Sequence, residues 1–79
     1  MANEEQERIV TEIESRLKDD QEGSFRASLA SGIDEQLVAI DAALRKGVPP
    51  AEGQELQKLK AGFESARDIL ERTWSSFHR

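Results

Sequence analysis

Apolar residues in the middle of the chain recur with the period of an α-helix. Six of them follow one another at spacings of four, four, four, three and four residues: Phe25, Leu29, Ile33, Leu37, Ile40 and Leu44. This spacing places them on one helical face. Ser31 and Asp34 could form a capping box that restarts the helix beside Gly32. Because the stripe runs through this point, we predict one continuous helix from about Ser24 to Lys46.

A second stripe follows a break that contains two prolines. Gly47 can end a helix in a left-handed conformation, and Pro50 suits the first position of the next helix. Seven residues then recur at spacings of three and four: Leu56, Leu59, Phe63, Ala66, Leu70, Trp74 and Phe77. They predict a helix from about Pro50 to Ser75 or beyond. The short connection forces the two helices into an antiparallel hairpin. We expect four residues to be internal to this hairpin: Leu37, Ile40, Leu59 and Phe63.

The first residues of the chain predict a shorter and more polar helix. Asn3 and Gln6 have the spacing of a capping box, and a helix is expected from about Glu4 to Lys18. Its apolar residues form a narrow stripe: Ile9 or Val10, Ile13 and Leu17. Turn-prone residues from Asp19 to Gly23, with a left-handed position, mark a connection. A helix with so thin a stripe is marginal alone, and we expect this segment to be more mobile than the hairpin.

Together these patterns predict an all-α fold, an antiparallel helical hairpin with a short N-terminal accessory helix. Residues 1–23 form an acidic leader helix and its connection, and residues 24–79 form the hairpin. The 79 residues include 16 acidic and 11 basic side chains, a net charge of −5. The first 24 residues hold eight acidic and three basic residues, so they carry all of this excess. An acidic chain is poorly suited to nucleic acid or anionic lipid as its main ligand.

Few side chains could support catalysis or metal binding. A chain of this length buries too little surface for a sizeable active-site cavity, and it has no cysteine. His78 cannot complete an imidazole site alone, and we expect it to be solvated at a fraying terminus. Glu64 and Asp68 share a helix face, but interleaved basic residues favour a salt-bridged solvent face. We therefore expect no enzyme activity, cofactor or metal site.

No run of 18 apolar residues occurs, and the N-terminus has no basic segment followed by an apolar one. This pattern predicts neither a membrane span nor a secretory signal, and we expect a cytoplasmic protein.

The apolar residues exceed what two facing helices need. Further ones lie beside the two stripes or near the open end of the hairpin: Val38, Ala42, Gly62, Ile69, Thr73, Trp74 and Phe77. They could widen the hairpin core, with Trp74 and Phe77 folded back on Phe25 and Leu29. Alternatively they form a second face that binds a partner.

Several of these residues also carry a resemblance to a known family. The pattern comprises Ile33, Leu37, Ile40 and Leu44, then Arg45, Lys46 and Gly47, a proline-containing loop, Gln54 to Gln57, and a helix ending in Ile69 and Leu70. It resembles the YscE/PscE/SsaE family of small type III secretion proteins. The segment from Ile13 to Leu17 is similar to the acidic Leu-Glu-x-x-Leu helix at the start of those proteins. The likeness spans about Glu12 to Trp74.

Members of that family are co-chaperones of the needle subunit. The resemblance implies a bacterial cytoplasmic complex in which the hairpin stabilises a tetratricopeptide-like chaperone. That chaperone holds the needle subunit unpolymerised before export. A structural alternative is a homodimer, in which two hairpins form a four-helix bundle through the same seam. The two states can both occur, because a homodimer could bury the partner face until the chaperone arrives.

Overall fold

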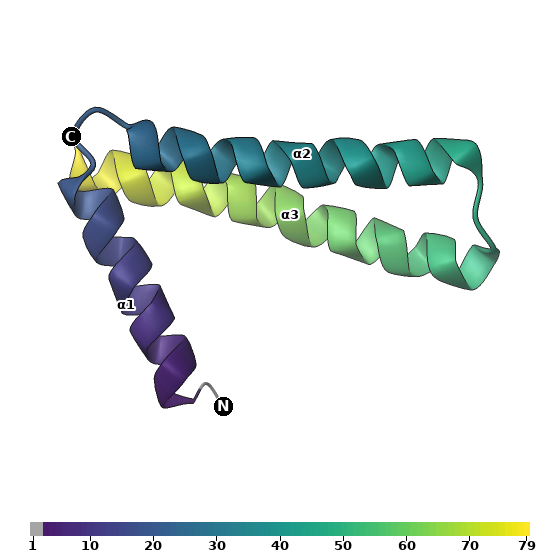
Figure 1. The fold of residues 1–79 in the computed structure, drawn as a ribbon, viewed down its shortest axis with the longest axis horizontal. Coiled ribbons are helices and arrows are strands. Elements are labelled where there is room, and N and C mark those ends of the chain that lie inside the picture. Colours follow the sequence, from purple (N-terminus) through teal and green to yellow (C-terminus); the bar gives the residue numbers. More distant parts are fainter. Residues whose placement is uncertain (1–2) are drawn as a thin grey trace.

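The computed structural model describes residues 3–79, which form three helices. They are α1 (Glu4–Asp19), α2 (Ser24–Lys46) and α3 (Pro50–Phe77). Helices α2 and α3 form an antiparallel hairpin, and α1 leaves it at a steep angle from the end where α2 begins and α3 ends (Figure 1). Residues 3–79 contain no strand. The predicted all-α hairpin with an accessory helix is therefore confirmed.

Local sequence signals set the helix boundaries. The side chain of Asn3 accepts the backbone N–H of Gln6 at 2.8 Å, and Gln6 Oε1 accepts the N–H of Asn3 at 3.4 Å. This confirms the capping box. Helix α2 runs unbroken through Gly32, so no restart occurs there. Gly23 and Gly47 have φ angles of 80° and 98°, a region that glycine adopts without steric cost.

None of the three helices is both long and apolar enough to cross a membrane, as far as residues 3–79 show.

The main core lies where the three helices meet. It consists of buried Leu17, Ala30 and Leu70, against which Phe25, Leu29, Ile33 and Trp74 pack. Leu17 is only 3% exposed, although it belongs to the polar leader. Its burial occurs at the end of α1 nearest the hairpin, and the rest of that helix is exposed. Helix α1 therefore contributes one core residue and closes the open end of the hairpin.

The seam of the hairpin is narrower than the sequence predicts. Ile40 is buried, and Leu37 and Phe63 are half-buried, which agrees with their expected place inside the hairpin. Leu59 is 51% exposed, so the prediction that it is internal is wrong. A single facing helix covers only part of a wide apolar arc, and Leu59 lies on the uncovered side of it.

Ion pairs line one flank of the seam. Three of them join α2 to α3: Lys60 Nζ to Asp41 Oδ1 at 2.9 Å, Arg67 Nε to Asp34 Oδ1 at 3.2 Å, and Arg26 Nη1 to Glu71 Oε1 at 3.0 Å. Glu71 also pairs with Arg67 within α3. The long side chains of Lys60 and Arg67 therefore lie on the side of α3 that faces α2, where Leu59 was expected.

We expect Leu70→Ala to lower the free energy of unfolding by about 2–5 kcal/mol, because it opens a cavity in the three-helix core. Leu59→Ala is the matched control and should cost less than about 1 kcal/mol, because Leu59 is half exposed. Urea denaturation followed by circular dichroism measures both values. Equal losses for the two variants would contradict this description of the core.

Candidate protein-binding surface

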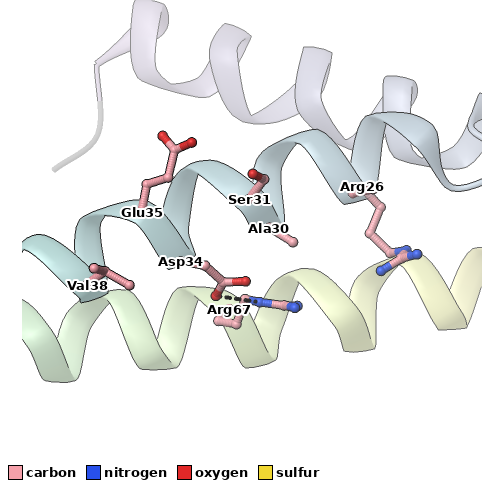
Figure 2. A pocket seen from close by; sticks show the side chains of 8 residues that line it. Arg26, Ala30, Ser31, Asp34, Glu35, Val38 and Arg67 are labelled. Carbon is pink, nitrogen blue, oxygen red and sulfur yellow. Dashed lines mark hydrogen bonds and ion pairs between the residues drawn. The ribbon is translucent and has the colours of Figure 1, made fainter.

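The residues predicted to contact a partner do not form one surface. Val38 is 70% exposed on α2 and lines a hollow beside the Asp34–Arg67 ion pair (Figure 2). Ile69 is 61% exposed on α3, where it and Thr73 line a different hollow, beside α1. Three further candidates are exposed at separate points of the hairpin: Ala42, Gly62 and Phe77.

Trp74, another candidate, is engaged inside the chain. Its Nε1–H donates to the backbone carbonyl of Asp20 at 2.8 Å. The guanidinium of Arg26 lies 5.1 Å from the centre of the Trp74 ring, and the ring of His78 stacks on it at 4.5 Å. Trp74 also packs against the three-helix core. This position agrees with the alternative in which it folds back on the start of α2.

His78 is half-buried and bonded, so the prediction of a solvated histidine is wrong. Its Nε2 lies 2.7 Å from the backbone carbonyl oxygen of Leu17 and donates to it. The carbonyls in the last turn of a helix lack partners within that helix and need donors from elsewhere. The Leu17 carbonyl accepts the backbone N–H of Asp20 at 3.3 Å, and His78 at the end of α3 supplies a second donor. We call the residues that meet here the joint: Leu17, Asp20, Gly23, Arg26, Trp74 and His78.

Asp20 caps the start of α2 from within the joint. Its carboxylate accepts the backbone N–H of Arg26 at 2.9 Å and that of Phe25 at 3.1 Å, and the Ser24 hydroxyl lies 3.4 Å away. Burial tends to raise the pKa of Asp20, but these hydrogen bonds together lower it below the ordinary value of 3.8. Sequence analysis missed this cap, because the side chain reaches five and six residues ahead instead of the usual two or three.

Gly23 permits this close packing. A Cβ atom there would lie 3.2 Å from Arg26 Nη2 and 3.5 Å from the Trp74 ring, and the φ angle of 80° adds backbone strain for other residues.

An apolar groove lies between α1 and the hairpin. Ten residues line it: Val10, Ile13, Glu14 and Leu17 from α1, Leu29 and Ile33 from α2, and Ala66, Ile69, Leu70 and Thr73 from α3. Its volume is about 390 Å³. The groove exists because α1 meets the core only through Leu17 and diverges from the hairpin beyond it (Figure 1).

The α3 wall of the groove belongs to a second stripe on that helix. Its members recur at spacings of three, four, three and four residues: Leu59, Gly62, Ala66, Ile69 and Thr73. A Cβ atom at Gly62 would meet no neighbouring side chain within 4 Å, so this side of α3 is open. The stripe was not expected from the sequence, because the spacing of Leu59 and Ala66 also fits the seam.

The α1 wall is acidic and has no ion pairs within the described part of the chain. Helix α1 carries six acidic and three basic residues. The ion pairs of residues 3–79 all lie within α2 and α3. Glu14 lines the groove, and Glu7 lines the adjoining hollow together with Val10. An apolar groove therefore borders a wall of uncompensated carboxylates.

No group of three or more acidic or histidine side chains in residues 3–79 is placed to hold a metal ion.

No family model, curated protein or solved structure matches this chain.

The joint and the ion-pair flank should make stability depend on pH. The hydrogen bond from Arg67 lowers the pKa of Glu71 below its ordinary value of 4.5, despite the opposing effect of burial and with help from Arg26. Despite the opposing effect of burial, hydrogen bonds also lower the pKa of Asp20 below its ordinary value. A carboxyl group with a lowered folded-state pKa stabilises the fold above its unfolded-state pKa, and this contribution disappears as pH falls through the folded-state pKa.

We therefore expect the melting temperature to fall as the pH drops below about 4.5. In an Asp20→Asn, Glu71→Gln double variant the fall should be shallower and the melting temperature near neutral pH lower. Thermal unfolding followed by circular dichroism across this pH range measures both effects. A double variant with the same pH dependence as the unaltered chain would contradict the assignment.

Proposed function

We propose that this chain is a non-catalytic co-chaperone of type III secretion. In this proposal the hairpin binds and stabilises a tetratricopeptide-like chaperone, which holds the needle subunit unpolymerised in the bacterial cytoplasm. The resemblance of the helical spacing and the hairpin loop to the YscE/PscE/SsaE family supports the identity of the partner. The distribution of apolar side chains in the structure supports a binding function.

That distribution is the observation on which the proposal mainly rests. Within residues 3–79 the buried apolar residues are Leu17, Ala30, Ile40 and Leu70. The exposed large apolar residues are more numerous: Ile9, Val10, Ile13, Val38, Leu59, Ile69 and Phe77. Three of these residues line one groove: Val10, Ile13 and Ile69. Exposed apolar side chains that gather at a groove are typical of an interface. Because a terminal helical repeat leaves its own apolar face uncovered, such a repeat is a suitable partner for this surface.

The polar groups of the joint are used structurally. The Asp20 carboxylate bonds to backbone N–H groups, and the Trp74 and His78 side chains bond to backbone carbonyls. These contacts hold helices together and need no substrate, which is consistent with a binding protein.

Self-association into a four-helix bundle is the second candidate function. The open stripe of α3 that runs from Leu59 to Thr73 favours it, because the small Gly62 and Ala66 would let the α3 helix of a second copy approach closely. A mass measurement in solution separates this candidate from the co-chaperone.

The co-chaperone proposal is tested by expressing this chain together with a candidate tetratricopeptide-type chaperone. We expect the two to co-purify, and we expect Ile69→Asp to abolish the complex because it places a charge in the apolar interface. The variant itself should stay helical, since Ile69 is 61% exposed. Glu64→Lys, on the solvent face, should change affinity by less than about 1 kcal/mol.

Size-exclusion chromatography with light scattering, on each chain alone and on the mixture, provides the readout. Lack of any complex would refute the co-chaperone proposal. If this chain alone forms a dimer that Ile69→Asp dissociates, the self-associating module is the better description. Trp74 is unsuitable as a probe, because its substitution disrupts the joint before any partner is added.

A further inference from the structure

We infer that the groove between α1 and the hairpin binds an amphipathic helix of another protein, whose apolar face is flanked by basic residues. The inference rests on the proposed binding function, and it adds the site and the chemistry of the bound segment. It does not require the partner to be a tetratricopeptide-like chaperone.

The shape of the groove suits a helix. Val10 and Ile13 form one wall, Ile69 and neighbouring α2 residues form the other, and buried Leu17 and Leu70 lie at its base. The lining residues of α1 run from Val10 to Leu17, a length of about 12 Å or roughly two turns. A helix laid where the walls lie close together would contact both with residues spaced three and four apart.

The hairpin wall allows a close approach. Gly62 and Ala66 lie between the exposed Leu59 and Ile69 on the open stripe of α3. Small residues at this spacing let a neighbouring helix backbone come near, while the larger side chains at either end pack beside it. The partner residues that face Gly62 and Ala66 can therefore be large and aliphatic.

The unpaired carboxylates near the groove indicate which residues flank the apolar face of the bound helix. Glu14 lines the groove and Glu7 lies in the adjoining hollow, and neither is in an ion pair within residues 3–79. On the hairpin, by contrast, Asp34, Asp41 and Glu71 are already paired. Lysine or arginine beside the apolar face of the bound helix would neutralise the free carboxylates and select its orientation.

The same charge disfavours α1 of a second copy in the groove. A second copy could offer two exposed apolar stripes, the open stripe of α3 and the stripe of α1. The charge argument applies to α1. That helix carries six acidic residues against three basic ones. Its insertion would place carboxylates of one copy against Glu7 and Glu14 of the other, which is repulsive.

The experiment uses the full chain and two synthetic helical peptides. Both peptides carry the same leucines at spacings of three and four, and the flanking residues are lysine in one and glutamate in the other. Fluorescence anisotropy measures their binding. We expect the lysine peptide to bind at least about tenfold more tightly than the glutamate peptide.

Paired variants locate the site. Ile69→Gln should weaken binding of the lysine peptide about tenfold, whereas Val38→Gln should not, although Val38 is even more exposed, on another flank of the hairpin. The Glu7→Lys, Glu14→Lys variant should reverse the preference between the peptides. The Glu35→Lys, Glu52→Lys variant changes the net charge equally at exposed sites that do not line the groove, and it should keep the preference. Circular dichroism checks that each variant is folded.

Three outcomes would overturn the inference. The first is equal or absent binding of the two peptides. The second is an effect of the control variants as large as that of the groove variants, which would show general charge attraction. The third is a dimer of this chain that Ile69→Gln dissociates, which would show a second copy in the groove. Peptide selectivity without any chaperone complex would refute only the co-chaperone proposal, and a complex without selectivity would refute only this inference.

Discussion

Asp20 joins all three helices, and the hydrogen bond from Trp74 Nε1 to its carbonyl ties α3 to the end of α1. The Asp20 carboxylate caps α2, while its carbonyl accepts the indole of α3. His78 adds a second bond from α3 to the last turn of α1. These polar contacts surround buried Leu17, so they form in a partly desolvated place where leaving one of them unmade is costly.

The position of the joint explains why the groove exists. Helix α1 is held only at its C-terminal end, and from there it diverges from the hairpin (Figure 1). Its apolar residues Val10 and Ile13 therefore face a space that none of the three helices in residues 3–79 fills. A chain of 79 residues buries a smaller share of its surface than a larger domain does, and three of its exposed apolar residues, Val10, Ile13 and Ile69, gather at the groove. This concentration supports the proposed binding function.

The two flanks of the hairpin have different chemistry. On one flank, Arg67 and Lys60 pair with acidic residues of α2, so the charges there are balanced within the chain. On the other, the groove has apolar walls and the carboxylate of Glu14 at its edge. Balanced ion pairs at the surface offer little net attraction to a partner, whereas an apolar surface beside unpaired charge offers both affinity and selectivity.

The sequence by itself determined the helices and their order. The capping box at Asn3, the break at Gly47 and the period of the apolar residues act over three or four positions, so the helix limits could be predicted within a few residues. Only the tertiary structure decided which side of the apolar arc on α3 faces α2. There Arg67 reaches Asp34, and Leu59 is left exposed. It also decided that Trp74 and His78 serve the joint, because their partners are 54 and 61 residues away in the chain. Contacts at such separations have no local signal in the sequence, since they depend on how complete helices pack.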